Sequence, residues 1–150
     1  MMQAKDITKP AVCISEDTSL REAVERMVRD QTNTLLVTGD GGVLVGEVSV
    51  SDLLDAVIPE TLTGDDVIDH FTTEEQFIAA VQAAADRSIE DCMVHDFTAV
   101  AADDELITIA ANAIAHQRAR IPVVDEENRP IGIISRQGLK QILAQFMDIR

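Results

Sequence analysis

The feature that most constrains this chain is an internal repeat, because shifting the sequence by 86 residues superposes its two halves without a gap. Identical residues recur at this shift in the pairs Asp17 and Asp103, Leu20 and Leu106, Gln31 and Gln117, Val37 and Val123, Gly46 and Gly132, Ser49 and Ser135, and Leu53 and Leu139. A fixed period of this kind indicates two copies of one structural unit. Since a unit of about fifty residues is only marginally stable alone, we expect the two copies to share one core.

The hydrophobic pattern predicts the same order of elements in each repeat. Apolar residues recur at helical spacing over residues 20–28 and 106–114, and Ser19 with Glu22 has the spacing of a capping box. β-branched runs joined by short turns predict hairpins, at 34–37 with 43–48 and at 121–124 with 131–134. Short apolar segments at 12–14 and 98–100 precede the helices, and further helices are expected at 52–58, ended by Pro59, and at 139–146. The expected fold is α/β (α+β), with two β-α-β-β-α repeats related by a pseudo-two-fold axis.

The predicted domain organisation is a first repeat at 1–60, a linker with a connecting helix at 61–88, and a second repeat at 89–150. In the linker, residues 63–66 have the composition of a helix cap, and Phe77, Ile78, Val81 and Ala85 form an apolar stripe. We expect this helix to pack against the repeats, so that the whole chain forms one module.

Composition excludes several classes of partner. With 27 acidic against 12 basic residues the net charge is −15, whereas nucleic acids and anionic membranes attract Lys and Arg. No run approaches the length of a membrane helix, and the amino terminus lacks the pattern of a signal peptide, so we expect a cytoplasmic protein without nucleic-acid or membrane partners. Cys13 and Cys92 are far apart in sequence and suggest buried reduced thiols.

Residues 46–52 form a motif that is suited to binding a ligand. Between Gly46 and Asp52 a strand is expected to end at Ser49 and a helix to begin near Asp52. A hydroxyl, free backbone N–H groups and a carboxylate then converge at a helix N-terminus, where Asp52 can accept two hydrogen bonds from a ribose cis-diol and Ser49 can help to hold a phosphate. The alternative is that Ser51 or Asp52 only caps the helix.

These residues resemble a tandem pair of cystathionine β-synthase (CBS) domains, the Bateman module. The resemblance covers about 5–58 and 91–146, and it is most typical in the strand RIPVVD at 120–125, followed by GIIS at 132–135. It implies a regulatory protein that binds an adenine nucleotide (AMP, ADP or ATP) or S-adenosylmethionine in clefts between the repeats. The resemblance also implies that ligand binding is signalled to a partner, here an unknown effector protein. It further implies a homodimer that forms through the helices, as is common among similar modules. For this face we expect the apolar residues Leu139, Ile142, Leu143 and Phe146.

Carried over residue by residue, the resemblance predicts one cleft built on the first motif. Its ligand-binding residues are Val48, Ser49 and Asp52 from one repeat, facing Thr98, Arg118, Ala119, Arg120, Ile121 and Pro122 from the other. Arg118 and Arg120 are candidates for contact with a phosphate, with surface salt bridges as the alternative.

The second motif departs from the family pattern, because Gly138 stands where the ribose-binding Asp is expected. The residues expected at this second, weaker site are Cys13, Thr32, Asn33, Thr34, Ile134, Ser135 and Arg136. Loss of a charged hydrogen-bond acceptor costs about 1.5–3 kcal/mol, so we expect one good site rather than two.

Two other functions stay open. Asp66, Asp69 and His70, with Glu74 and Glu75 beyond, are spaced to gather a divalent cation on one helix face, but an acidic solvated helix is the simpler and favoured interpretation. A module that dimerises without a ligand is the other alternative. Enzymatic activity is not expected, because His70, His95 and His116 belong to no catalytic or metal-binding signature.

Overall fold

The computed structural model describes residues 2–58, 66, 69–118 and 120–149. In the first repeat the elements are a 3-10 turn at Ala4–Asp6, β1 (Cys13–Ser15), α1 (Leu20–Asp30), β2 (Thr34–Thr38), a 3-10 turn at Asp40–Gly42, β3 (Leu44–Ser49) and α2 (Val50–Val57). They continue with α4 (Glu74–Ala84), a 3-10 turn at Ile89–Asp91, β4 (Val100–Ala101), α5 (Leu106–His116), β5 (Ile121–Val124), β6 (Pro130–Ile134) and α6 (Arg136–Phe146).

Each repeat forms one three-stranded mixed sheet, in the orders β1-β2-β3 and β4-β5-β6. In both sheets the first pair of strands is parallel and the second pair is antiparallel. The antiparallel registers shift between Val37 and Thr38 and between Val123 and Val124, which are equivalent positions under the 86-residue shift. The predicted fold class and the repeat are therefore confirmed, down to a local irregularity of the hairpin.

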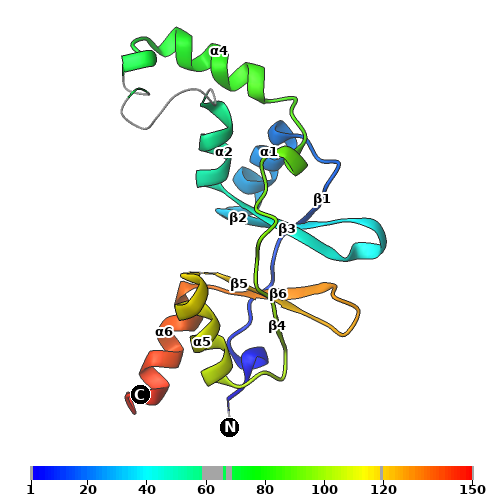
Figure 1. The fold of residues 1–150 in the computed structure, drawn as a ribbon, viewed down its shortest axis with the longest axis vertical. Coiled ribbons are helices and arrows are strands. Elements are labelled where there is room, and N and C mark those ends of the chain that lie inside the picture. Colours follow the sequence, from blue (N-terminus) through cyan, green and yellow to red (C-terminus); the bar gives the residue numbers. More distant parts are fainter. Residues whose placement is uncertain (1, 59–65, 67–68, 119, 150) are drawn as a thin grey trace.

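The two sheets lie next to each other in the middle of the molecule, with α1, α2 and α4 beyond the first sheet and α5 and α6 beyond the second, and both hairpin turns point the same way (Figure 1). Ser19 caps α1 as expected, but Glu22 accepts from the Ser19 hydroxyl instead of completing a capping box. Helices α2 and α6 begin at Val50 and Arg136, two or three residues earlier than predicted, because Ser49 and Ser135 are the N-cap positions.

The connecting helix α4 packs against α2, as its apolar stripe suggested. Its N-cap is Thr73, which forms a capping box with Gln76. The predicted cap at 63–66 falls for the most part, and the stop at Pro59 entirely, outside the described residues.

The cores of the two repeats exchange short segments of chain. Ala4 and Ile7, at the start of the chain, are buried in the core of the second repeat, whereas Ile89 and Met93 are buried in the core of the first. Backbone hydrogen bonds fix both crossings: Ala4 N–H donates to the carbonyl of Asp104 (2.8 Å), and Ile89 N–H donates to that of Thr18 (2.8 Å). Neither core is thus formed from one continuous half of the sequence.

Two equivalent glycines make room for the crossing segments. A Cβ on Gly46 in β3 would lie 2.7 Å from the Met93 sulfur, and a Cβ on Gly132 in β6 would lie 2.6 Å from the carbonyl oxygen of Lys9. Real Cβ atoms do not approach other atoms so closely, so the exchange requires glycine at both positions.

The apolar stripe of the last helix is divided between core and surface. Ile142 is buried in the second core and Leu139 is packed against it, whereas Leu143 and Phe146 are exposed. The expectation of four exposed residues was therefore wrong for Ile142, because it lies on the face of α6 that packs on the sheet.

Candidate functional site

The start of α2 is held by a reciprocal pair of hydrogen bonds. The Ser49 N–H and hydroxyl both donate to Oδ2 of Asp52, at 2.8 and 3.0 Å, and the Asp52 N–H donates back to the Ser49 hydroxyl at 3.4 Å. The capping alternative raised by the sequence is thus realised, with Ser49 rather than Ser51 as the cap. Among the described residues no hydrogen bond reaches Oδ1 of Asp52, so the carboxylate keeps acceptor capacity for a ligand hydroxyl.

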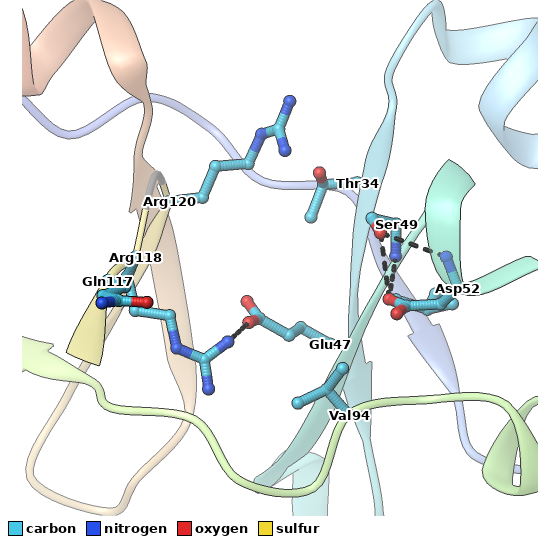
Figure 2. Close-up of a pocket in the computed structure, with 9 residues that line it drawn as sticks. Thr34, Glu47, Ser49, Asp52, Val94, Gln117, Arg118 and Arg120 are labelled. Atoms are coloured by element: carbon cyan, nitrogen blue, oxygen red, sulfur yellow. Dashed lines mark hydrogen bonds and ion pairs between the residues drawn. The ribbon is translucent and has the colours of Figure 1, made fainter. Parts of the chain in front are cut away.

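This helix start opens onto a cavity of about 220 Å³ between the two repeats, here called the first cleft (Figure 2). Its lining residues are Thr34, Glu47, Val48, Ser49, Asp52, Val94, Gln117, Arg118 and Arg120. The end of β3 and the start of α2 form one wall, and the residues between α5 and β5 form the other. The structure therefore brings the first motif to face the second repeat.

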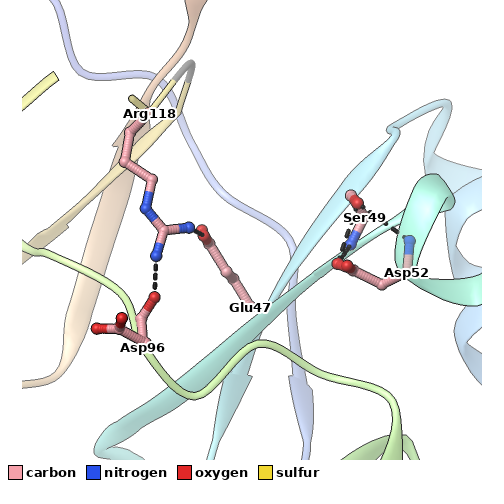
Figure 3. A network of polar contacts seen from close by, with 5 residues as sticks. All are labelled: Glu47, Ser49, Asp52, Asp96 and Arg118. Atoms are coloured by element: carbon pink, nitrogen blue, oxygen red, sulfur yellow. Dashed lines mark hydrogen bonds and ion pairs between the residues drawn. The ribbon is translucent and has the colours of Figure 1, made fainter. Parts of the chain in front are cut away.

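An ion pair crosses the first cleft. The Arg118 guanidinium donates to Oε1 of Glu47 at 2.7 Å and also donates to the backbone carbonyl of Asp96 (Figure 3). The Glu47 side chain is 11% exposed and that of Arg118 is 23% exposed. Because this pair is largely withdrawn from water, either charge alone would be poorly solvated.

The Glu47 carboxylate in the first cleft is only partly satisfied. Its Oε2 atom is buried and has no hydrogen-bond partner among the described residues. Burial raises the pKa of the Glu47 carboxyl, and the Arg118 guanidinium opposes that shift while the neighbouring Asp52 carboxylate adds to it. The cleft therefore contains a carboxylate oxygen that can accept a hydrogen bond from a ligand.

Most of the predicted residues of the first cleft lie in it. Val48, Ser49, Asp52, Arg118 and Arg120 line the cavity together. The residues that do not line it are Thr98, Ile121 and Pro122. The last two are buried within β5, where they pair with β6, and Ala119 is outside the described residues.

Four lining residues were not predicted for the first cleft: Thr34, Glu47, Val94 and Gln117. Gln117 has an available signal, because it is identical to Gln31 at the 86-residue shift and both end a helix with positive φ, at 51° and 52°. Residues other than glycine, Asn and Asp seldom adopt this conformation, so an identical pair of this kind marks a constrained corner. Glu47 has no such signal, because its equivalent is Ile133.

The second motif faces a separate cavity of about 480 Å³, here called the second cleft. Its lining residues are Lys9, Pro10, Ala11, Val12, Gln31, Thr32, Asn33, Thr34, Leu36, Arg120, Ile133 and Ser135. Four of the predicted residues are among them, namely Thr32, Asn33, Thr34 and Ser135. The two equivalent residues Thr34 and Arg120 line both clefts and so form a shared wall.

Three residues predicted for the second cleft lie elsewhere. Ile134 is buried in the second core, and Arg136 is an exposed residue of α6 that does not line the cavity. Cys13 lines a different cavity against α1, because successive residues near a strand point to opposite faces and Val12 takes the position towards the cleft. Burial raises the pKa of the Cys13 thiol, which keeps it protonated near neutral pH.

The start of α6 lacks the bonds seen at α2. Ser135 makes no side-chain capping bond, and its Oγ atom is buried without a hydrogen-bond partner among the described residues. A Cβ on Gly138 would lie 3.0 Å from Cγ2 of Ile134 and 3.1 Å from the carbonyl oxygen of Ile7. The glycine that replaces the expected Asp is thus packed directly against the exchanged amino-terminal segment.

The described part of the chain offers few sites of other kinds. It contains no group of three or more His, Cys, Asp or Glu residues placed to hold a metal ion, so the proposed acidic cluster at 66–75 does not converge there. No helix within it combines the length and apolar character needed to cross a lipid bilayer.

Comparison with known families agrees with this architecture. The model of the CBS domain matches residues 4–72 and 89–145 of the chain. The chain belongs to the CBS domain family. Its two matched segments form a tandem CBS pair, the Bateman module, and the exchanged residues around Ile7 and Ile89 lie inside them.

Relatives of the CBS pair span nearly its whole length. Uncharacterized protein MJ1426 of Methanocaldococcus jannaschii is 26% identical over 157 residues, covering 95% of this chain and 92% of that protein. Among solved structures, protein MJ0100 in complex with 5′-methylthioadenosine and S-adenosyl-L-methionine has a TM-score of 0.70 at 20% identity, covering 97% of this chain and 98% of that chain. CBSX2 from Arabidopsis thaliana in complex with AMP has a TM-score of 0.70 at 23% identity, covering 98% and 99%. At these identities the two structures show a shared fold.

Proposed function

We propose that this CBS pair is a regulatory module that binds an adenosyl compound in the first cleft and passes its occupancy to a partner protein. The observation that supports this proposal most directly is that Ser49 and Asp52 face Arg118 and Arg120 across a cavity between the repeats. Two CBS pairs of the same fold form complexes with AMP or with S-adenosyl-L-methionine, which supports this class of ligand.

The chemistry of the first cleft suits a ribose. Asp52 accepts two bonds on Oδ2 from its own helix cap, which orients the carboxylate and leaves Oδ1 for the ribose diol. The buried Oε2 of Glu47 is a second acceptor, suited to a hydroxyl or amino group of the ligand. Two free acceptor oxygens close to one helix N-terminus favour a ligand rich in hydrogen-bond donors.

The two arginines of the cleft take different roles in this proposal. Arg118 is bound to Glu47, which corresponds to the salt-bridge alternative, whereas Arg120 makes none of the ion pairs found between described residues. Arg120 is therefore the residue that we assign to a phosphate or carboxylate of the ligand.

Regulation follows from the position of the cleft between the repeats. A ligand that contacts both walls stabilises the arrangement of repeats that it fits best, in proportion to its differential affinity. The Glu47–Arg118 pair already joins the two walls, so a ligand acts by adding to or competing with that contact. The ligand is bound and released without chemical change.

The test is thermal unfolding of the wild type and of Asp52→Ala with AMP, ADP, ATP or S-adenosylmethionine, with and without magnesium. A ligand at 100 times its dissociation constant stabilises the native state by about 2.7 kcal/mol. We expect at least one adenosyl compound to do so, and Asp52→Ala to weaken it about 10- to 100-fold. Asp55→Ala, an exposed acid on the same helix, is the matched control. If nucleotide-free protein shows no shift with any of them, the proposal is wrong.

Self-association is the second candidate function, favoured by exposed apolar residues on α5 and α6. Ile107, Ile114, Leu143 and Phe146 are each more than half exposed. Exposed apolar groups gathered on neighbouring helices are typical of interfaces. We propose a homodimer through this face, and light scattering after size exclusion tests it: Ile114→Glu with Phe146→Glu should give a monomer from a wild-type dimer. A wild-type monomer at high concentration would refute it.

A further inference from the structure

The first cleft has one cation left over for an anionic group of a ligand. Of its two guanidiniums, that of Arg118 already donates to Oε1 of Glu47 (2.7 Å) and to the backbone carbonyl of Asp96. Arg120 makes none of the ion pairs found between described residues. A ligand with several negative charges therefore gains one attraction, and it also meets the carboxylates of Glu47 and Asp52 in the same lining.

The start of α2 has already used most of its donors. A helix N-terminus binds anions through backbone N–H groups that lack a partner within the helix. Here the Ser49 N–H donates to Oδ2 of Asp52 at 2.8 Å, and the Asp52 N–H donates to the Ser49 hydroxyl at 3.4 Å. The Val50 N–H donates to the carbonyl of Asn33 at 3.1 Å. Asp52 also places a negative charge at this positive end of the helix, so the site is poorly suited to a phosphate.

One buried carboxylate oxygen of the first cleft still needs a donor. Oε2 of Glu47 has no hydrogen-bond partner among the described residues, and a buried acceptor left unpaired is destabilising. A phosphate dianion cannot satisfy it, because its oxygens are acceptors. An ammonium group supplies three N–H donors and a positive charge. Glu47 and Arg120 project from opposite walls of the cavity (Figure 2), so a ligand between them meets an acceptor on one side and a cation on the other.

The fold itself does not require the charges of this pair. At the 86-residue shift the equivalents of Glu47 and Arg118 are Ile133 and Thr32, which carry no charge. Replacing both partners of a buried ion pair by uncharged residues is often neutral for stability. Stability therefore gives little reason for a buried Glu47, whereas recognition of a ligand does.

We propose that the first cleft selects an adenosyl compound with a zwitterionic amino-acid group over nucleotides, and that Glu47 and Arg120 determine this specificity. Oε2 of Glu47 accepts from the ammonium group of the ligand, Arg120 binds its carboxylate, and Asp52 accepts from the ribose diol. Arg118 holds the Glu47 side chain and is a positioning residue. This inference rests on the proposed function and deepens it, because it names the ligand class of the same cleft.

The first experiment measures dissociation constants by calorimetry for compounds that share adenosine and differ in its 5′ substituent. We expect the wild type to bind S-adenosylmethionine at least about tenfold more tightly than AMP or 5′-methylthioadenosine, which both lack the amino-acid group. S-adenosylhomocysteine keeps the zwitterion but has no sulfonium charge. It should bind within about threefold of S-adenosylmethionine.

The second experiment repeats these measurements on variants of the two specificity residues. Glu47→Gln keeps an oxygen that accepts from Arg118 but loses the charge. We expect it to weaken S-adenosylmethionine about 10- to 100-fold and to bind AMP at least as tightly as the wild type, because Arg118 is no longer neutralised. Arg120→Gln should weaken S-adenosylmethionine and AMP but leave 5′-methylthioadenosine unchanged. Glu75→Gln and Arg136→Gln make the same changes at exposed residues outside the cleft, and should alter none of these constants.

A double variant covers the case in which a single substitution disturbs folding. Glu47→Ile with Arg118→Thr leaves no charge unpaired, and it should lose the preference for S-adenosylmethionine over 5′-methylthioadenosine. Urea unfolding of every variant shows that a change in affinity is not a loss of folded protein.

Three results would overturn the inference. The first is a wild type that binds AMP as tightly as S-adenosylmethionine, and the second is a Glu47→Gln variant with an unchanged ratio of these two constants. The third is S-adenosylhomocysteine binding no better than 5′-methylthioadenosine. In all three cases adenosyl compounds still bind, so the proposed function stands and this inference alone fails. If none of the compounds binds the wild type or the variants, both are wrong.

Discussion

The two clefts occupy equivalent places in the repeat but differ in their charged groups. At the start of α2 Ser49 and Asp52 form a capping box, whereas at the start of α6 the equivalent serine has neither an acid beside it nor a side-chain capping bond. The Glu47–Arg118 ion pair that crosses the first cleft has Ile133 and Thr32 as its equivalents in the second. One backbone architecture thus carries an acceptor-rich cleft and a cationic cleft, because a few substitutions set the charge of each lining.

The largest test of this comparison breaks the ion pair. Arg118→Ala leaves Glu47 without its counter-charge in a place where the side chain is 11% exposed. Removing one partner of a buried pair costs about 3–5 kcal/mol, and we expect about 3 kcal/mol because Arg118 is partly exposed. Urea unfolding measures the loss of unfolding free energy.

The matched variant converts the first cleft to the residues of the second. Glu47→Ile with Arg118→Thr removes both charges together, so no charge is left unpaired. We expect its unfolding free energy to lie within about 1 kcal/mol of the wild type. If the double variant is as unstable as Arg118→Ala, the ion pair stabilises the protein in its own right and our account of it is wrong.

The next test puts the missing acid into the second cleft. In Gly138→Asp the new Cβ meets Ile134 and the Ile7 carbonyl at 3.0 and 3.1 Å, and a backbone carbonyl cannot swing aside. We expect a loss of about 1–3 kcal/mol, typical of overpacking. Gly138→Ala separates the steric cost from the charge, since it should show most of the same loss in urea unfolding. A stabilised Gly138→Asp variant would mean that Gly138 is not there for packing.

The third test compares the two serines. Ser49→Ala removes the cap of α2 and should cost about 1 kcal/mol. Ser135→Ala removes a hydroxyl that makes no hydrogen bond to any described residue, so its unfolding free energy should stay within about 0.5 kcal/mol of the wild type, or rise. Thermal and urea unfolding of both variants, without ligand, measure the difference. Equal losses would contradict the asymmetry of the two helix starts.

The smallest expected effect is a dependence on pH that arises in the first cleft alone. Because burial raises the pKa of Glu47 above its ordinary value of 4.5, the folded protein keeps this proton where the unfolded chain has lost it. The unfolding free energy contributed by Glu47 therefore falls as the pH rises above 4.5. We expect the wild type to lose stability relative to Glu47→Gln between about pH 4 and pH 7, measured by urea unfolding. A constant difference would contradict the raised pKa.

Much of the fold was predictable because it repeats. The 86-residue period and the spacing of apolar residues such as Leu20 and Leu106 are local properties of the sequence, and they set the helices and hairpins. Ser49, Asp52, Arg118 and Arg120 were placed by the family resemblance, which describes how one repeat faces the other.

The missed features depend on contacts between distant segments. Glu47 and Arg118 are 71 residues apart, and nothing in the sequence near either residue indicates the other. The exchange of Ile7 and Ile89 between cores was equally hidden, since an isolated apolar residue in a loop has no periodicity. Cys13 was misplaced for a simpler reason, a one-residue shift along an extended segment, which reverses the face on which a side chain lies.

The exchange of segments also bears on the order in which the protein can form as it is synthesised. The core of the first repeat is incomplete until Met93 has left the ribosome, and Ile7 waits for a partner sheet whose last strand ends at Ile134. Contacts between residues so far apart in sequence slow folding, because the intervening chain must be ordered first. The segment around Ile7 is thus among the last to find its place, and the two repeats mature as a single folding unit.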